Sequence, residues 1–172
     1  MRVILVNPCL CGDTVQRLGP ITGNLFYNSA PLGLGYLAAV LERKNHDVKI
    51  IDAPVEGLSI AGVIERIADS PADIVGITTH TISALSAYEL ARQIRNKFPG
   101  VKIVAGGPHI TSNPHELLEH PELDVAVLGE GEVTFEELAQ AFEDGRDLAG
   151  IKGLAYNRGG KVFFTPQREF IS

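Results

Sequence analysis

The sequence has little of several residue types, and each scarcity excludes a class of protein. Tryptophan is absent, and aromatic residues make up only 6% of the 172 residues. Two cysteines in a chain of this size do not make a disulfide framework. No apolar run is long enough to span a bilayer, and Met1-Arg2 leads into an expected strand rather than into a signal peptide. We therefore expect a cytoplasmic protein without a membrane partner.

Positive charge is also scarce. The chain has 15 Lys and Arg against 21 Asp and Glu, which gives a net charge of −6, and no basic run appears. A nucleic-acid partner therefore has no electrostatic support. A hydrophobic content of 45% together with 18 glycines indicates a compact α/β domain with many tight turns. The length suits one domain, or one domain with an appendage.

Short apolar runs rich in β-branched residues alternate with amphipathic segments along the chain. The expected strands cover roughly residues 2–7, 48–52, 73–78, 101–106 and 124–128. The expected helices cover roughly residues 33–44, 59–69, 84–98, 114–119 and 133–143. Continuous apolar strands are typical of a sheet that is buried on both faces. Five strand–helix repeats predict a doubly wound, five-stranded parallel sheet of the flavodoxin-like or Rossmann-like type.

The end of the chain follows a different pattern. Residues 153–157 and 161–164 flank Arg158-Gly159-Gly160, which predicts a β-hairpin with a glycine turn. Residues 165–172 show no packing pattern of their own and are expected to begin a linker. The sequence is therefore divided into an α/β domain, residues 1–150, and a hairpin with the start of a linker, residues 151–172.

Small or polar residues follow every expected strand. These segments are Asn7-Pro8, Asp52–Gly57, Thr78–Thr81, Gly106–His109 and Gly129–Glu132. In an open parallel sheet, ligands bind beyond the carboxyl ends of the strands. Five such strand ends predict one large, flat ligand lying across that edge.

Several familiar ligands of this architecture are excluded by the same segments. The first strand is not followed by G-x-G-x-x-G, and no G-x-x-x-x-G-K-[ST] occurs, so dinucleotide and P-loop sites are not predicted. A phospho-receiver domain needs an aspartate at the end of the third strand, where this chain has Thr78. A flavodoxin needs a Thr/Ser-rich phosphate loop after the first strand, and the threonines there are scattered.

The strand ends resemble a known set of motifs when they are taken in order. The family signature D-x-H-x-x-G, S-x-L and G-G falls on Asp52–Gly57, Thr78–His80 and Gly106-Gly107. Residues 31–38 and Gly129–Phe135 add further matches. Along essentially its whole length the chain resembles the cobalamin-binding, amino-terminal domains of cobalamin-dependent radical S-adenosylmethionine enzymes.

The resemblance implies a cobalamin site with the nucleotide tail between the third and fourth strand ends. The implied cofactor-binding residues are Asn7, Asp52, Pro54, Gly57, Thr78, Thr79, His80, Thr81, Gly106, Gly107, Pro108, His109, Gly129, Glu130, Gly131 and Thr134. The long segment from about Cys9 to Pro31 is expected over the upper face of the corrin ring, because loops of this length are usually functional or disordered.

The resemblance also implies two things that this chain lacks. The C-x-x-x-C-x-x-C motif that holds a [4Fe–4S] cluster is absent, so the cluster and S-adenosylmethionine would belong to a catalytic domain after Ser172. The family's lower axial histidine falls at Pro54, and proline has no ligand atom. Cobalamin is therefore expected base-off, without a histidine below the cobalt, and no complete catalytic site is expected in this chain.

Other interpretations stay open at this point. The chain is also consistent with a degenerate, non-binding domain for substrate docking or dimerisation, or with a flavodoxin-like domain for another small molecule. His80 and His109 each suit a cofactor-facing group or a solvated loop residue. Gly106-Gly107-Pro108 also suits an ordinary turn. The spacing of Cys9 and Cys11 matches no pattern that defines a metal or redox site.

Overall fold

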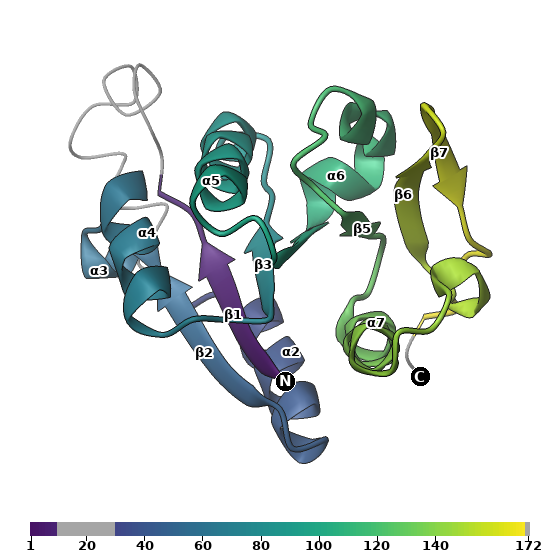
Figure 1. Ribbon diagram of the computed structural model, residues 1–172, viewed down its shortest axis with the longest axis horizontal. Coiled ribbons are helices and arrows are strands. Elements are labelled where there is room, and N and C mark those ends of the chain that lie inside the picture. Colours follow the sequence, from purple (N-terminus) through teal and green to yellow (C-terminus); the bar gives the residue numbers. More distant parts are fainter. Residues whose placement is uncertain (10–29, 171–172) are drawn as a thin grey trace.

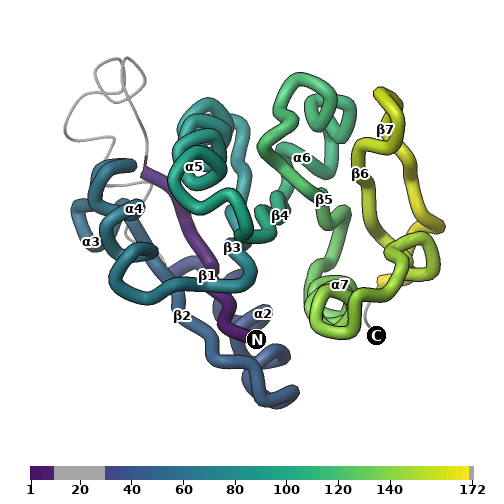
Figure 2. The backbone as a smooth tube through the Cα atoms, in the orientation of Figure 1, coloured from purple at the N-terminus to yellow at the C-terminus, as the bar shows by residue number. Residues whose placement is uncertain are grey.

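The computed structural model describes residues 1–9 and 30–170, which form a seven-stranded sheet in the order β2-β1-β3-β4-β5-β6-β7 (Figure 1). Five strands are parallel: β1 (Arg2–Asn7), β2 (Asp47–Asp52), β3 (Ile74–Thr78), β4 (Lys102–Gly106) and β5 (Val125–Val127). The hairpin strands β6 (Leu154–Arg158) and β7 (Lys161–Phe164) continue the sheet in antiparallel pairing. Figure 2 shows them at the opposite end of the sheet from β2.

Helices cover both faces of the sheet. One face carries α2 (Leu32–Arg43) and α7 (Glu132–Asp144), whose buried apolar side chains share one core cluster with Val3 and Leu5 of β1 and Val104 of β4. The other face carries α4 (Ile60–Asp69) and α5 (Ala84–Lys97). The described ranges also contain the shorter helices α3 (Ala53–Glu56) and α6 (Pro108–Ser112) and the 3-10 helices η1 (Pro114–Leu118) and η2 (Leu148–Gly150). The parallel strands are therefore buried on both sides, as their continuous apolar sequences require.

The predicted doubly wound parallel sheet is confirmed, and each predicted strand lies within about two residues of its observed bounds. The sheet has seven strands because the predicted hairpin joins it, with Val127 paired to Leu154. Gly159 and Gly160 have φ angles of 63° and 79°, the left-handed conformation that a tight hairpin turn needs. The division of the chain at residue 150 stays a prediction.

Two short α-helices and the 3-10 helix η2 were not predicted. Both α3 and α6 carry a proline in their first turn, Pro54 and Pro108; α3 follows β2 directly, and α6 follows β4 after one residue, Gly107. Proline fixes φ at the value that the first helical turn needs, so these segments begin helices although their composition is typical of turns. The predicted helix at residues 114–119 is a 3-10 helix, and its flanking Asn113 does not cap it but donates its side-chain amide to the carbonyl of His109.

The order of the strands fixes where a ligand can bind. From β1 the chain passes through α2 to β2 on one side, whereas β3 lies on the other side of β1. This reversal opens a crevice beyond the carboxyl ends of β1 and β3.

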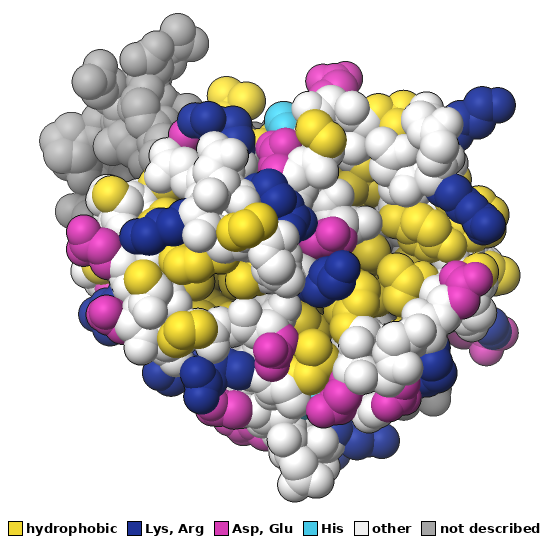
Figure 3. Space-filling view, viewed as in Figure 1, with side chains coloured by type: hydrophobic (Ala, Val, Ile, Leu, Met, Phe, Trp, Pro, Cys, Tyr) yellow, Lys and Arg dark blue, Asp and Glu magenta, His cyan; other side chains and the backbone are white. Residues whose placement is uncertain are grey.

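Acidic and basic side chains are interspersed on the face shown in Figure 3. Among the described residues, no helix is both long enough and apolar enough to cross a bilayer.

Candidate functional site

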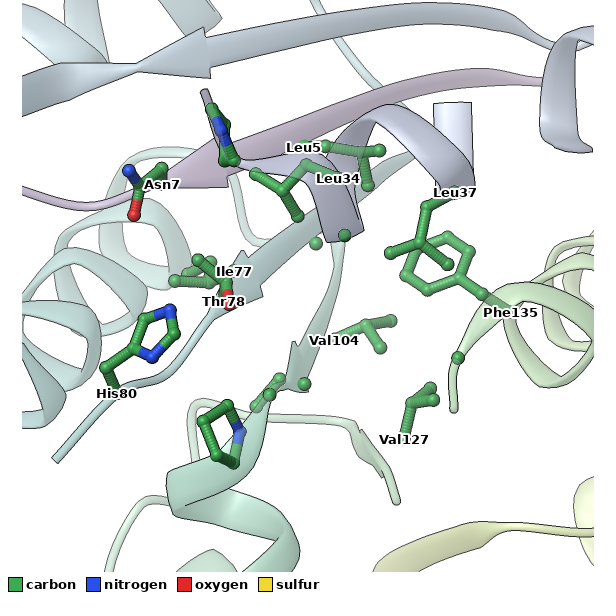
Figure 4. Close-up of a pocket in the computed structure, with 18 of the residues that line it drawn as sticks. Leu5, Asn7, Leu34, Leu37, Ile77, Thr78, His80, Val104, Val127 and Phe135 are labelled. Atoms are coloured by element: carbon green, nitrogen blue, oxygen red, sulfur yellow. The ribbon is translucent and has the colours of Figure 1, made fainter. Parts of the chain in front are cut away.

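A cavity of about 540 Å³ lies between the sheet and the two helices α2 and α7 (Figure 4). It begins at the carboxyl ends of β1, β3, β4 and β5 and reaches inward under both helices. Its volume is in the range of about 300–1,000 Å³ that is usual for small-molecule sites. The cavity therefore lies where the strand order predicts a ligand.

The floor of the cavity is built from two rows of residues that share one face of the sheet. Leu5, Gly76 and Val104 are register partners on β1, β3 and β4, and we call them the deep row. The edge row lies two residues further along the same strands and consists of Asn7, Thr78, Gly106 and, on β5, Val127. Because side chains alternate along a strand, both rows face α2 and α7.

The deep row has a glycine at its centre. A Cβ atom added to Gly76 would lie 2.9 Å from Leu5 Cδ2 and 3.1 Å from Phe135 Cε2. The aromatic ring of Phe135 thus rests directly on the backbone of β3, which sets the depth of the cavity. A glycine inside an apolar strand often marks such a close approach, and this was the available indication in the sequence.

The wall opposite the sheet is also apolar. Leu34 and Leu37 from α2 and Phe135 from α7 face the same space as Leu5, Val104 and Val127 (Figure 4). Sequence reasoning missed these lining residues, because their spacing is that of ordinary core positions. Residues 31–38 were noted as a motif without a role, and they supply the beginning of α2 that borders the cavity.

Polar groups gather at the edge row and in the loops beside it. Asn7 donates its side-chain amide to Asp52 Oδ1 at 2.9 Å, Thr78 is half-buried, and His80 is exposed. In Figure 4, Asn7 and His80 lie at one end of the cavity, away from Phe135. The predicted site residues that line the cavity are Asn7, Thr78, His80, Gly106, Gly107, Pro108, Gly129, Glu130 and Gly131.

One buried carboxylate oxygen in the lining accepts no hydrogen bond from the described residues. Glu132, the first residue of α7, lines the cavity, and its Oε2 atom is buried without a partner among the described residues. Buried polar atoms are nearly always hydrogen-bonded, so an exception calls for an explanation. A ligand that donates a hydrogen bond here would supply the missing partner.

The other predicted residues lie outside the cavity lining: Asp52, Pro54, Gly57, Thr79, Thr81, His109 and Thr134. Thr79 is buried, donates its hydroxyl to the Gly106 carbonyl at 2.8 Å and accepts from the backbone N–H of Ile110 at 3.1 Å. Gly107 has a φ of 100°, and a Cβ there would lie 2.8 Å from the Thr79 carbonyl oxygen. These contacts join the ends of β3 and β4. Packing of the backbone therefore explains why Thr79 and Gly107 occupy these positions.

His109 belongs to a polar cluster on the other face of the sheet. Its Nε2 lies 3.1 Å from Glu116 Oε2 and its Nδ1 lies 3.3 Å from Thr81 Oγ1. Tyr88 donates its hydroxyl to the same Glu116 oxygen at 2.7 Å. Burial, assisted by that hydrogen bond, raises the pKa of Tyr88 well above its usual range. Burial opposes ionisation of Glu116, yet the hydrogen bonds from Tyr88 and His109 lower its pKa overall.

Thr134 ties the end of the described chain to α7. Its buried hydroxyl donates to the Lys152 carbonyl at 3.2 Å and accepts from Arg168 Nε at 2.7 Å. Arg168 also pairs with Glu137. The segment after β7 is therefore held against the first turns of α7, next to the cavity wall that contains Phe135.

The placement of the segment from about Cys9 to Pro31 over the corrin ring stays a prediction, because residues 10–29 lie outside the described residues. Cys11, whose role the sequence leaves open, lies in the same range. Cys9 is half-buried against the core of the α4 and α5 face. Within the described part of the chain, no three His, Cys, Asp or Glu side chains are arranged to hold a metal ion.

Comparison with known proteins adds a family and several relatives. A family model described as "B12 binding domain" matches residues 19–139. An uncharacterized methyltransferase from Pyrococcus horikoshii is 41% identical over 99% of this chain and 36% of its own length. The cobalamin-dependent radical SAM methyltransferase TokK from Streptomyces tokunonensis is 30% identical over 82% of this chain and 21% of its own length.

A solved structure is similar over nearly the whole chain. The radical S-adenosylmethionine methyltransferase TsrM from Kitasatospora setae, solved with cobalamin and a [4Fe–4S] cluster, superimposes with a TM-score of 0.78 at 25% identity. The match covers 99% of this chain and 30% of TsrM. The chain thus spans about a third or less of the length of these relatives.

Proposed function

This chain belongs to the B12-binding domain family, and we propose that it holds cobalamin across the carboxyl edge of its sheet. The corrin ring lies over the strand ends, and the nucleotide tail enters the cavity under α2 and α7. The observation that carries the proposal is the cavity itself, which opens at the strand ends where a tail would enter.

The residues present fit such a tail. Gly106 lines the cavity, and the nearest atom to a Cβ added there is the Val127 carbonyl oxygen at 3.9 Å, so the space beside it is open. The apolar deep row and its facing leucines suit an aromatic base. Asn7, Thr78 and the Glu132 oxygen, which has no partner among the described residues, suit the polar ribose and corrin amides. A bulky residue at position 106 would close this space.

Below the cobalt, the proposed site offers no histidine at the family position. Pro54 lies in α3, outside the cavity lining, and carries no ligand atom. When the nucleotide tail lies in the cavity, its base is not bound to the cobalt, so the cofactor is held base-off. When bound, cobalamin supplies a cobalt centre that carries a methyl group or electrons. The chain's own residues bind the tail, shield it from water and orient the ring.

The reaction of the whole protein is proposed from the relatives. TokK and TsrM are named as radical S-adenosylmethionine methyltransferases. A relative from Synechocystis, 32% identical over 96% of this chain, is named as an anaerobic magnesium-protoporphyrin IX monomethyl ester cyclase. We propose that this chain is the cofactor module of such a methyltransferase- or cyclase-like enzyme. Its partner is a radical S-adenosylmethionine domain that holds the [4Fe–4S] cluster.

The direct test is retention of a corrinoid by the purified chain. Hydroxocobalamin is added, the protein is desalted, and the visible spectrum is recorded; we expect a retained corrinoid with a base-off spectrum. Gly106→Trp should abolish retention by filling the cavity. Gly100→Trp is the matched control, because Gly100 is exposed and has open space around its Cβ position. Thermal unfolding of both variants shows that they fold.

Each alternative has its own outcome. No retention by the wild-type chain would contradict the proposal and favour a non-binding docking domain. Retention by Gly106→Trp equal to that of the control would place the tail elsewhere. Nitrogen splitting in the electron paramagnetic resonance spectrum of the bound cobalt(II) form would reveal a lower nitrogen ligand. His80→Ala tests whether the histidine beside the cavity supplies it.

A further inference from the structure

The deep end of the cavity has a chemistry that distinguishes one kind of corrinoid tail from another. We propose that it selects cobamides by their lower base, favouring a dimethylbenzimidazole or a phenol over a purine. The inference rests on the proposed function, because it requires the nucleotide tail to enter this cavity.

The first step is that the described side chains around the deep row are apolar. Leu5 and Val104 flank Gly76 on the floor, and Leu34, Leu37 and Phe135 face them from the helices. The peptide groups of the floor are also committed, because β3 and β4 each have a hydrogen-bonded strand on both sides. A base that reaches this depth therefore meets carbon atoms among the described lining residues.

The second step is that the polar lining groups lie nearer the mouth. Asn7 and Thr78 are two residues beyond the deep row on their strands, which is roughly 7 Å at about 3.3 Å per residue. Glu132 begins α7, and Phe135 lies about one helical turn further in. These groups are placed for the hydroxyl groups of the ribose rather than for the base at the end of the tail.

The third step is the difference between the bases. A purine such as adenine carries an exocyclic amino group and ring nitrogens that water hydrogen-bonds. Burying such groups without partners is unfavourable by an amount that lowers affinity roughly tenfold or more per group. A dimethylbenzimidazole places two methyl groups on an aromatic ring at that end, and a cresol places one. Both leave fewer polar atoms unpaired against Leu5, Val104 and Phe135.

The test compares four corrinoids bound to the wild-type chain: hydroxocobalamin, an adenine-bearing cobamide, a cresol-bearing cobamide and cobinamide, which has no nucleotide tail. All four are compared in the cobalt(I) state, in which no lower base is bound to the cobalt, so release of the base does not enter the comparison. We expect the dimethylbenzimidazole and cresol forms to bind with similar affinity and the adenine form roughly tenfold or more weakly. Equal affinity of the three cobamides, all well above cobinamide, would overturn the selectivity and leave the proposed tail site standing. Equal affinity of cobinamide and the others would overturn the tail site itself, and no binding at all would overturn the proposed function.

A pair of variants locates the selectivity in the deep row. Val104→Thr adds a hydroxyl group inside the cavity, so the preference for hydroxocobalamin over the adenine form should fall several-fold. Val125→Thr is the control, because Val125 is the register partner of Val104, is equally buried, and does not line the cavity. A change of preference that is the same in both variants would overturn the assignment to the deep row.

Discussion

The two faces of the sheet are formed by the same strands, but side chains fill one face and leave a cavity on the other. On the face of α4 and α5, alternate residues of β3 and β4 such as Val75, Ile77 and Ile103 fill the space below the helices. On the face of α2 and α7, the intervening positions include Gly76 and Gly106, and a cavity of about 540 Å³ remains. The difference of a few side chains on one face decides where the protein can hold a ligand.

The polar groups of the two faces differ in the same way. Beside α5, Tyr88, His109 and Glu116 satisfy one another within a closed cluster. Beside α7, the Glu132 oxygen is buried with no partner among the described residues. The polar cluster beside α5 is complete without a ligand, whereas the Glu132 oxygen lines a cavity in which a bound ligand would supply its missing donor.

The largest effect is expected at the residue that joins the ends of β3 and β4. Thr79→Val keeps the shape of the side chain but leaves the buried Ile110 N–H without its side-chain acceptor. The variant should lower the free energy of unfolding by about 1–3 kcal/mol, measured by urea denaturation, and weaken corrinoid retention. Thr81→Val, at an exposed position, should change stability by less than about 0.5 kcal/mol. Equal effects of the two variants would contradict the role of Thr79 in joining the ends of β3 and β4.

A smaller cost in stability but a clear loss of binding is expected at the cavity floor. In Gly76→Ala the new Cβ pushes Leu5 and Phe135 into the open cavity, at a cost of about 1 kcal/mol. Corrinoid affinity should fall because the cavity becomes shallower. Gly35→Ala, on the exposed side of α2 with open space around it, should stabilise the protein by roughly 0.5–1 kcal/mol. Unchanged affinity in Gly76→Ala would mean that the ligand does not reach the deep row.

Periodicity was sufficient to predict the strands, the long helices and the edge of the sheet where the cavity begins. It was not sufficient for the depth of the cavity. Leu5, Leu34 and Phe135 follow the same pattern whether a core position is filled or open, because the pattern reports which face is buried and not how much space is left there. That space depends on which residues meet across β1, β3 and β4, and register is a property of the folded sheet.

The same limit applies to residues that were expected to bind the cofactor. Thr79, Gly107 and Thr134 are small and lie at strand or helix ends, which is equally typical of ligand contacts and of close backbone packing. In the structure each contacts another segment of the chain. Thr79 contacts the loop that follows β4, Gly107 contacts the loop that follows β3, and Thr134 contacts the segment that carries Arg168. Composition alone does not distinguish these two reasons.

The smallest expected effect concerns pH and the polar cluster beside α5. Despite burial, hydrogen bonds from Tyr88 and His109 hold the pKa of Glu116 below its usual value in the folded protein, so the ionised side chain stabilises the fold above the unfolded pKa, and this contribution is lost as pH falls through the folded pKa. The difference in unfolding free energy between wild type and Glu116→Gln should therefore be full near neutral pH and shrink below about pH 4.5. Corrinoid retention at neutral pH should be unchanged, because Glu116 lies outside the cavity lining. A stability difference that does not vary with pH would contradict this role of the ionised Glu116 side chain, and a loss of retention would show that the two faces are coupled.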